Sequence, residues 1–567
     1  MNSATREMLE QHFDTAFAAP DGIKKLRELI LTLAMQGKLV PQDPRDPPAS
    51  QLLKEIAAEK KRLVKEGKIN APKPLPEIAA KEILYDIPTG WEWVRFGEIA
   101  QHNSGKTLDK GRNTGLPRDY ITTSNLYWGS FELGSVRQML IREEELEKCT
   151  VKKDDLLICE GGEAGRAAVW NFETEVCFQN HIHRARLFGS IDPYFAYRFF
   201  EKLNATGEIA QHRKGVGISN MSSKALGAIS IPLPPLPEQH RIVARIDRLM
   251  ARCDELERLR AEREQKRRSV HTAALKQLLD AQAADSVADA WQFISRHFGD
   301  LYAVKENVIE LRKAVLQLAV MGKLVPQNPN DPPASQLLKE IEAEKKRLVN
   351  GGKIKAPKPL PKIKTAEMPF VLPPGWEWCR VWDVSQLITS GSRDWAAYYS
   401  DSGAIFVTMG NLSRGSYQLR MDTIRYVAPP VTGEGSRTKL EENDLLISIT
   451  GDVGNLALIP SNFGDAYINQ HTCLLRLMPI CRSRYFPELM RSPLAKVQFD
   501  APQRGIKNSF RLGDVGEMII PLPPLPEHHR IVAKIDQLMA LCDTLEHQID
   551  AATDKQTELL DALMAPA

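Results

Sequence analysis

Most of this sequence is written twice, and that duplication constrains the fold more than any other feature. The segment Leu26–Pro76 returns as Leu311–Pro361, with 39 of 51 positions identical. The stretch Ile231–Met250, "IPLPPLPEQHRIVARIDRLM", returns as Ile520–Met539 with three differences, which are Gln239/His528, Arg245/Lys534 and Arg248/Gln537. A chain repeated in this way is expected to fold as two similar halves related by an approximate twofold axis.

Two segments between the repeats differ strongly, Val94–Ser230 and Cys379–Ile519. They keep a faint common frame: "DDLLICEGGEAG" echoes "NDLLISITGDVG", and "SNLYWGSFEL" echoes "GNLSRGSYQL". Short β-rich runs such as "DLLIC", "AAVW" and "DLLISI" alternate with Gly and Asn turns. We therefore predict two similar α/β mixed (α+β) globules of about 140 residues each.

Helices and a linker are expected in the shared segments. Leu26–Gln36 has helical spacing and stops at Gly37, and Ser50–Glu66 reads as a charged amphipathic helix. Ala71–Pro76 is proline-rich and reads as an extended linker.

The motif "PLPPLP" predicts a stiff joint that leads into a long helix. Pro237 and Pro526 suit the first helical turn, and Glu238 and Glu527 suit its positive end. Apolar residues then step by four and three, with one polar interruption, along Ile531, Ile535, Leu538, Cys542, Leu545, Ile549, Ala552, Gln556, Leu559 and Leu563. In the first copy the same seam runs along Ile242, Ile246, Leu249, Cys253 and Leu256, is basic at Arg260, Arg263 and Arg267, and recovers at Val270 and Ala274.

Two such helices are expected to pair as an antiparallel coiled coil that holds the globules apart. The predicted domains are helical segment and linker 1–90, globule 91–235, helix 236–285, second helical segment 286–375, second globule 376–524 and C-terminal helix 525–567.

Composition excludes several classes of protein. The sequence contains no run of eighteen apolar residues, so no membrane span is predicted. The N-terminus lacks the charged and then apolar segments of a signal peptide. Eight cysteines without a CxxC pair argue against a zinc site or a disulfide framework and indicate a reducing cytoplasm. The net charge of +3 is too small to indicate a DNA-binding protein unless cations cluster locally.

A search for catalytic motifs is negative. "NSGKT" at Asn103 lacks the first glycine of a phosphate-binding loop, because position 100 is Ala100. "DPPA" at Asp46 and Asp331 lacks the aromatic residue of an adenine methyltransferase motif. "QNHIH" offers two histidines without a third ligand nearby, so a polar loop is favoured over a metal site. We predict no catalytic and no metal-binding residues.

Polar loop positions in the globules are the candidates for DNA binding. The stretches "QHRKGVGISNMS" at Gln211 and "QRGIKNSFR" at Gln503 combine cations, Gly and Asn or Ser, which suits joint contact to phosphates and base edges; a solvated surface loop is the alternative. The candidates are Lys106, Arg112, Asn125, Arg213, Lys214 and Asn220 in the first globule, and Arg393, Asn411, Arg504, Lys507 and Asn508 in the second.

The duplicated "GWEW", "IPLPPLPEQHRIVARID" and "GKLVPQ" with "DPPASQLL" resemble the specificity subunit of type I restriction–modification systems. The resemblance covers nearly the whole chain. It implies two target recognition domains that each read one half of a bipartite DNA sequence, on helices that set the spacer and dock modification subunits. It implies no catalytic site and no cofactor in this chain.

The implied partners are double-stranded DNA, two adenine-methyltransferase modification subunits and restriction (translocase) subunits, which would use S-adenosylmethionine, ATP and Mg. Two alternatives stay open from the sequence: the DNA-reading subunit of a methylation-only complex, and a duplicated coiled-coil scaffold for proteins.

Overall fold

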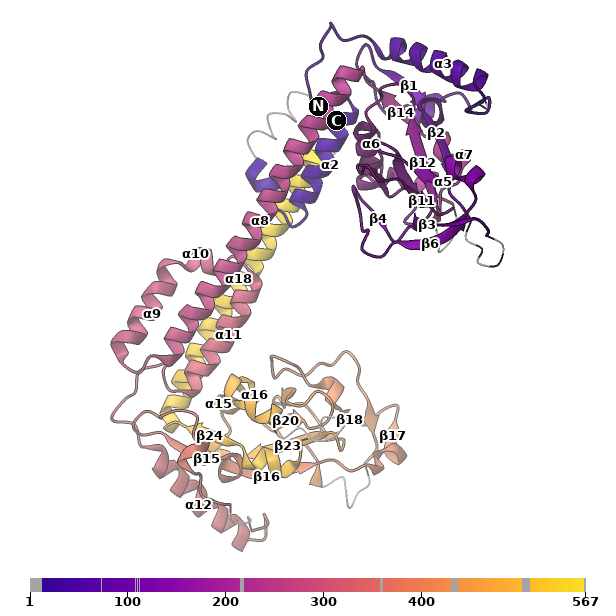
Figure 1. Cartoon of the computed structure of the whole chain (residues 1–567). Helices are drawn as coiled ribbons and strands as arrows, with labels where there is room; N and C mark the ends of the chain where they lie inside the picture. Colours follow the sequence, from indigo (N-terminus) through magenta and orange to yellow (C-terminus); the bar gives the residue numbers. More distant parts are fainter. Residues whose placement is uncertain are drawn as a thin grey trace. The chain divides into compact units, whose positions relative to one another are not determined.

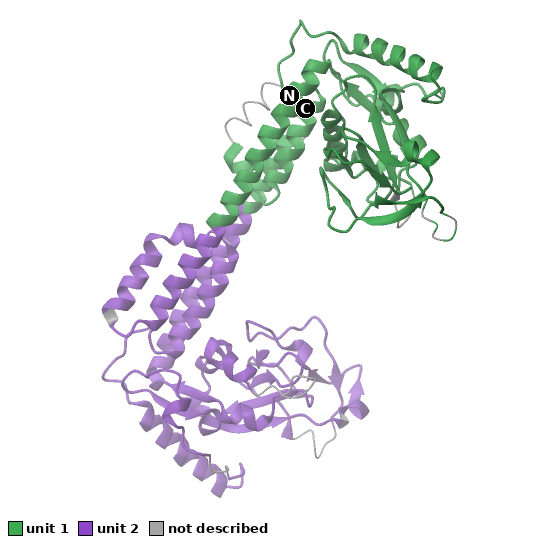
Figure 2. Cartoon of the chain, viewed as in Figure 1, with its two compact units in different colours: residues 1–263, 553–567 green, residues 264–552 purple. Residues whose placement is uncertain are grey.

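The computed structural model describes residues 13–72, 74–107, 109, 111, 113–214, 219–356, 360–429, 437–501 and 510–564 (Figure 1). The chain forms two compact units (Figure 2). Unit 1 comprises Met1–Arg263 and Thr553–Ala567, and unit 2 comprises Glu264–Ala552. Each unit holds one copy of the repeated segments and one of the two divergent globules, as the duplication predicts.

The first globule starts and ends on the same two-stranded ribbon. Strand β1 (Glu92–Arg95) pairs antiparallel with β14 (Ser230–Leu233), so both ends of the globule leave from one place. Between them lies a four-stranded antiparallel sheet in the order β10-β8-β12-β2. Its strands are β2 (Ala100–Ser104), β8 (Leu156–Cys159), β10 (Ala167–Val169) and β12 (Ile182–Leu187).

A second sheet has the order β6-β3-β11-β7, in which β11 and β3 are parallel. Its strands are β3 (Leu116–Ile121), β6 (Arg137–Ile141), β7 (Thr150–Val151) and β11 (Val176–Phe178). The smaller elements are the hairpin β4–β5 (Leu126–Tyr127, Ser130–Phe131), the pair β9–β13 (Gly161–Gly162, Ser219–Asn220), and the helices α4 (Phe96–Ile99), α5 (Leu146–Cys149), α6 (Pro193–Ala205) and α7 (Ser223–Gly227).

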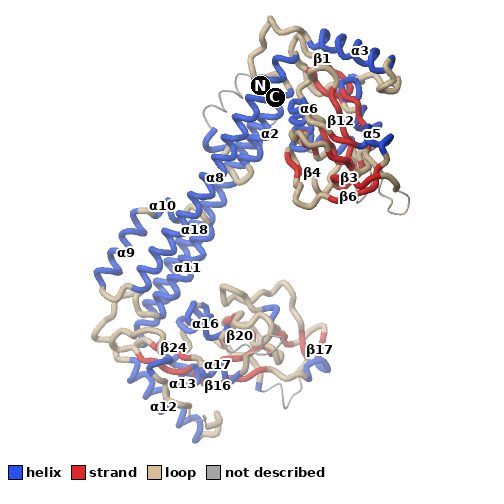
Figure 3. Tube along the Cα trace, in the orientation of Figure 1, coloured by secondary structure: helices blue, strands red, loops and turns tan. Residues whose placement is uncertain are grey.

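The second globule repeats this topology. The ribbon β15–β24 closes it, the sheet β16-β23-β20-β21 matches the first sheet in reverse order, and β19-β18-β22 matches β6-β3-β11, parallel pair included. The strands are β15 (Glu377–Arg380), β16 (Ser385–Ser390), β17 (Tyr399–Ser400), β18 (Ala404–Val407), β19 (Tyr426–Val427), β20 (Leu445–Ser448), β21 (Leu456–Leu458), β22 (Ala466–Ile468), β23 (Thr472–Leu477) and β24 (Ile519–Leu522). The helices are α13 (Val381–Val384), α15 (Tyr485–Arg491), α16 (Pro493–Asp500) and α17 (Leu512–Glu517). Figure 3 shows the strands of each globule in red. The mixed α/β prediction is confirmed.

The run "LLIC" has a simple explanation in the packing. Leu156 and Ile158 of β8 join the core that includes α6, and Leu157 and Cys159 join the core beneath the second sheet. Alternate side chains of a strand point to opposite faces, so a central strand covered on both faces reads as continuously apolar.

The shared segments are helical, with bounds close to those predicted. They form α2 (Gly22–Met35) and α3 (Ala49–Lys65) in unit 1, and α11 (Lys305–Val320) and α12 (Ala334–Asn350) in unit 2. The second copy is preceded by α9 (Ala284–Arg296) and α10 (Phe298–Leu301). Arg27 of α2 pairs with Asp254 and Glu257, and Arg312 of α11 pairs with Asp543 and Glu546. The same ion triad therefore ties each shared helix to a long helix.

The long helices are α8 (Leu236–Asp280) and α18 (Leu525–Met564). Both helices cross the boundary between the units: residues 236–263 of α8 and 553–564 of α18 belong to unit 1, and residues 264–280 and 525–552 belong to unit 2 (Figure 2). The expected seam needs correction at three residues: Leu256 is 40% exposed, Ala552 is exposed, and Val270 is 43% exposed, whereas His271 beside it is 2% exposed. A straight helix drifts against a 3.5-residue repeat, so the buried stripe moves by one residue along the basic stretch.

A search of the described helices finds none that is both long and apolar enough to cross a bilayer.

Candidate nucleic-acid interface

The repeated motifs of unit 1 meet at one buried joint at the start of α8. Glu238 is 1% exposed, and its two carboxylate oxygens accept from Trp91 Nε1 at 2.9 Å and from Gln42 Nε2 at 2.7 Å. One turn further along α8, Arg241 pairs with Asp46 at 2.6 Å. Burial raises the pKa of the Glu238 carboxyl. The motifs that contain these residues therefore position the globule on the helix.

Unit 2 builds the same joint from the second copy. Glu527 accepts from Trp376 Nε1 at 3.0 Å and from Gln327 Nε2 at 2.6 Å, and Arg530 pairs with Asp331 at 2.6 Å. Burial likewise raises the pKa of Glu527. "DPPA" supplies the aspartate of this joint in both units, which gives that motif a structural role.

One side chain differs between the two joints. Gln239 accepts from the Asp192 N–H at 3.1 Å and donates to the Pro234 carbonyl at 2.9 Å. His528, at the equivalent place, lies 3.1 Å from Ser483 Oγ through Nδ1 and 3.2 Å from the Pro523 carbonyl through Nε2. Burial lowers the pKa of His528 to about 4, so the imidazole is neutral at neutral pH.

A loop rich in glycine, residues 160–166, connects several polar segments of the first globule through hydrogen bonds; we call it the glycine loop. Its Glu160 backbone exchanges hydrogen bonds with His181 and Met221, each at 2.8 Å. Its Gly161 and Gly162 pair with β13, and its Ala164 carbonyl accepts from Arg213 Nε at 2.7 Å. Gly162 and Gly165 have φ of +75° and +93°, which residues with a side chain rarely adopt.

The β4–β5 hairpin lies against this loop. Trp128 Nε1 donates to Glu163 Oε1 at 2.8 Å, and the Arg166 guanidinium pairs with Glu163 at 3.0 Å. Arg166 also donates to the Thr123 carbonyl at 2.7 Å and lies 5.5 Å from the centre of the Tyr127 ring. The hairpin tip and the glycine loop thus form one surface, on which Tyr127 is 48% exposed.

The second globule has the same two parts with different side chains. Its glycine loop, residues 449–455, bonds to His471 and Phe510 as the first loop bonds to His181 and Met221. Gly451 and Gly454 have φ of +67° and +88°. The segment that matches the hairpin bonds through Ser413 to Leu456, the first residue after this loop, and Arg414 lies 3.7 Å from Asp452 within it.

The predicted residues of the first globule have different surroundings. Arg213, Lys214 and Asn220 come together beside the glycine loop, with Lys214 and Asn220 exposed. The Lys106 ammonium pairs with Glu145, and this bond lowers the pKa of that carboxyl to about 2. Asn125 is 2% exposed and uses its amide to hold the hairpin, accepting from the Thr122 N–H and donating to the Glu132 carbonyl, both at 2.9 Å. Arg112 lies outside the described residues.

In the second globule Arg393 is exposed just before a short helical turn, Asp394–Tyr398. Asn411 is 7% exposed and holds its loop as Asn125 does, accepting from the Thr408 N–H at 2.9 Å and donating to the Arg420 carbonyl at 2.9 Å. Both asparagines therefore face their own globule in this structure. Arg504, Lys507 and Asn508 lie outside the described residues.

Two motifs weighed for chemistry prove to be structural. Gly105 of "NSGKT" lies so close to the Phe178 carbonyl that a Cβ would sit 2.1 Å from its oxygen, so the glycine serves close packing. His183 of "QNHIH" is fully buried between Ser104 Oγ at 3.2 Å and the Met221 carbonyl at 2.8 Å, while His181 is exposed. Within the described ranges, no group of three or more His, Cys, Asp or Glu side chains could hold a metal ion.

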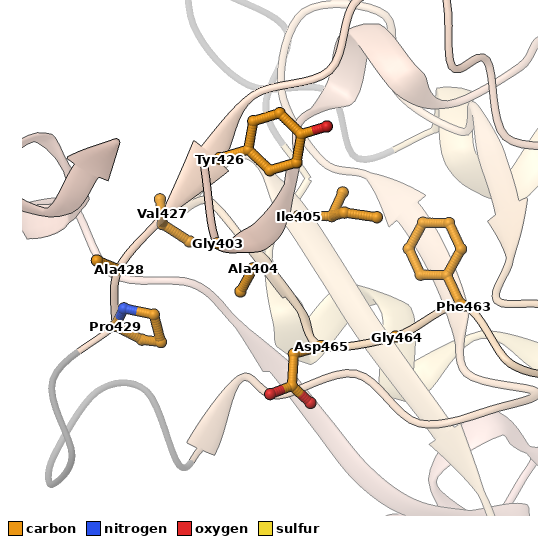
Figure 4. Close-up of a pocket in the computed structure, with 10 residues that line it drawn as sticks. All are labelled: Gly403, Ala404, Ile405, Tyr426, Val427, Ala428, Pro429, Phe463, Gly464 and Asp465. Carbon is orange, nitrogen blue, oxygen red and sulfur yellow. The ribbon is translucent and has the colours of Figure 1, made fainter. Parts of the chain in front are cut away.

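The second globule contains a hollow between the ends of β18 and β19 (Figure 4). Ile405, Tyr426 and Phe463 make it largely apolar. Among its ten lining residues Asp465 alone carries a carboxylate, and that group pairs with Lys439 at 2.7 Å. A smaller hollow beside Asn411 is lined by the exposed Arg420 and Arg425, and cations there suit phosphate contact.

Sequence reasoning missed Tyr127, Trp128 and Glu163, and their counterparts Arg414 and Asp452. The signal was present in the echo of "SNLYWGSFEL" by "GNLSRGSYQL", which places Trp128 and Arg414 at the same position. Composition favoured loops rich in cations and amides, and so passed over an aromatic residue and an acid.

Comparison with known proteins agrees with the internal duplication. The family model described as "Type I restriction modification DNA specificity domain" matches residues 88–264 and 373–553. The chain is 33% identical to the type I restriction enzyme EcoAI specificity subunit of Escherichia coli over 96% of this chain and 93% of that protein. It is 32% identical to the EcoEI specificity subunit of Escherichia coli over the same shares. The solved HsdS subunit from Thermoanaerobacter tengcongensis aligns with 18% identity and a TM-score of 0.45, over 85% of this chain and 99% of that one.

Proposed function

This chain belongs to the DNA specificity subunits of type I restriction–modification systems, and from that premise we propose that each of its two target recognition domains reads one half of a bipartite DNA sequence. The recognition domains are the two globules described above. Specificity subunits are the non-catalytic parts of these complexes, so the role of the chain is to choose the DNA sequence on which its partners act.

One observation carries the proposal: the same scaffold presents different side chains in the two units. The joints repeat their Trp–Glu, Gln–Glu and Arg–Asp bonds, from Trp91–Glu238 to Trp376–Glu527. The glycine loops repeat in backbone conformation. The surfaces beside those loops differ, with Trp128 in one globule and Arg414 in the other. Two equivalent supports with unlike surfaces suit two unlike half-sites.

The contact surface that we propose centres on the glycine loops. Arg213, Lys214 and Asn220 border the loop of the first globule, where exposed cations and amides suit phosphates and base edges. Arg393 is a candidate for DNA contact in the second globule. Lys106 is a candidate in the first, and its ammonium would have to leave the ion pair with Glu145 in order to contact DNA. Arg112, Arg504, Lys507 and Asn508 remain sequence-based candidates. Asn125 and Asn411 are assigned the support of the surface, because their amides hold its loops.

The long helices are proposed to set the spacer between the half-sites and to dock two modification subunits. A helix has a fixed rise per residue, so its length can set the separation of the two recognition domains without any contact to the bases of the spacer. S-adenosylmethionine, ATP and Mg would be used by the modification and restriction subunits, with double-stranded DNA as the shared ligand.

A domain duplication tests this function. Residues 377–522, from β15 to β24, would be replaced by residues 92–233, from β1 to β14, because the two ribbons have the same register. The chimera would be purified with its modification subunits, and its methylated sites mapped by sequencing. We expect the second half-site to become a copy of the first in inverted orientation. Retention of the original second half-site by an active chimera would refute the proposal.

A further inference from the structure

We propose that the tip of the β4–β5 hairpin in the first globule and the matching segment around Arg414 in the second, each beside its glycine loop, are the base-reading edges, with Tyr127 and Arg414 as specificity-determining side chains. The inference rests on the proposed function and deepens it by naming which side chains distinguish the two half-sites. Neither residue belongs to the polar stretches that composition singles out.

The two edges are built on one backbone frame. Asn125 and Asn411 make the same bonds below the tip, and Gly129 and Gly415 at the tip both have positive φ, +66° and +80°. Each segment also bonds to the first strand residue after its glycine loop, from donors two positions apart in the alignment: Gly129 N–H donates to the Ala167 carbonyl, and Ser413 N–H donates to the Leu456 carbonyl. The aligned residues Trp128 and Arg414 each lie next to an acid of their own glycine loop, Glu163 and Asp452.

The side chains on this frame differ in how firmly they are held. Trp128 is hydrogen-bonded to Glu163 at 2.8 Å, an ordinary bond length. Arg414, at the same position, lies 3.7 Å from Asp452, which is beyond hydrogen-bond distance, and both side chains are more than 70% exposed. Arg414 can therefore turn toward a ligand, whereas Trp128 is held against its own globule by the bond to Glu163.

A weakly held arginine on a rigid tip suits one kind of base contact. A guanidinium donates two parallel hydrogen bonds to O6 and N7 of guanine in the major groove. We therefore assign Arg414 to a guanine in the half-site of the second globule. Its neighbours Arg420 and Arg425 line the hollow at the base of the same segment, where they suit phosphate contact.

In the first globule the exposed residue of the tip is Tyr127. Arg166 lies over one face of its ring and is itself held by Glu163 and the Thr123 carbonyl. Arg166 is thus committed to the globule and acts as a positioning residue for the ring. An exposed aromatic ring with a fixed orientation suits apolar contact with a base edge, such as the methyl group of thymine.

Rates of methylation on a library with both half-sites randomised test the assignment. The complex of this chain with its modification subunits would be compared with complexes that carry Arg414→Ala or Arg414→Lys. We expect Arg414→Ala to lose about 5- to 150-fold of the discrimination at one base pair of one half-site, and Arg414→Lys to lose less, because an ammonium also donates to guanine O6 and N7, with the other half-site unchanged in both. The lysine variant keeps the charge and an exposed position, so it separates base reading from loss of assembly. Tyr127→Ala is expected to act on the opposite half-site alone.

Two controls separate reading from a merely structural pair. Asp452→Asn removes the acid beside Arg414, and Lys439→Ala removes another exposed cation of the same globule that pairs with an acid. Both are expected to keep the original base preference. The inference is overturned if Arg414→Ala leaves every base preference within twofold, or if Asp452→Asn relaxes the same position equally. If the tip variants have no effect while the chimera above still moves the half-site, this inference alone fails and the proposed function stands.

Discussion

His528 makes the second joint sensitive to acid, and replacing it with glutamine is expected to remove that sensitivity. The imidazole is fully buried, 4.7 Å from the Tyr485 ring and 5.7 Å from the Phe486 ring between centroids. Burial lowers its pKa from an ordinary 6.5 to about 4. Glutamine fits the same place in the first joint, where Gln239 bonds to the equivalent proline carbonyl.

The size of the effect follows from the two pKa values. Between pH 6.5 and pH 4 the unfolded chain binds a proton at His528 that the folded chain excludes, so the stabilisation is complete above pH 6.5 and is lost as the pH falls. A full shift from 6.5 to about 4 corresponds to about 3 kcal/mol, at about 1.4 kcal/mol per pH unit. Between pH 7 and pH 5 the joint should therefore lose about 2 kcal/mol of opening free energy. The His528→Gln protein should lose none of this contribution to the opening free energy.

Hydrogen exchange read by mass spectrometry on peptides from residues 519–535 measures this opening in the full chain. Rates would be corrected for the intrinsic pH dependence of exchange. The wild-type protein is expected to lose about 2 kcal/mol more than His528→Gln from pH 7 to pH 5. Any constant offset between the two proteins at pH 7 is irrelevant to the comparison. Equal losses in the two proteins would refute the buried neutral histidine as the source.

Two further changes test other parts of the structure. Arg476→Ala leaves Asp444 buried without its two charged hydrogen bonds at 2.8 and 2.7 Å, and should destabilise the second globule by about 3–5 kcal/mol, visible as a lower melting temperature; an unchanged melting temperature would contradict the pairing. Insertion of one heptad after Arg263 lengthens α8 by about 10 Å, or at most about three base pairs of DNA. Methylome sequencing should then show a spacer changed by one to three base pairs, or loss of assembly, with both half-sites unchanged. An altered half-site with an unaltered spacer would contradict the division of labour between helices and globules.

The internal repeats and the helical periodicity predicted the architecture because both can be read from the sequence without knowing which residues are in contact. The duplicated segments predicted two halves, the turn at Gly37 predicted the end of α2 close to Met35, and "PLPPLP" predicted helices that begin at Leu236 and Leu525. The seam failed at Leu256, at Ala552 and, just after the basic stretch, at Val270. There the sequence offers Val270 and His271 as neighbours, and the choice between them depends on which side of the helix is covered by other helices.

The candidate surface was predicted less well, for a physical reason. Asn125 and Lys214 look alike as polar loop residues, but an amide buried beneath a hairpin and an ammonium in solvent differ through contacts made by residues far away in the chain.

The sequence by itself determined that the scaffold is built twice, since identical segments must make identical joints. Only the tertiary structure decided which side chains stand at the edge of each globule. Trp128 meets Glu163 and Arg414 approaches Asp452 because the hairpin and the glycine loop fold against each other, and no local pattern encodes that contact.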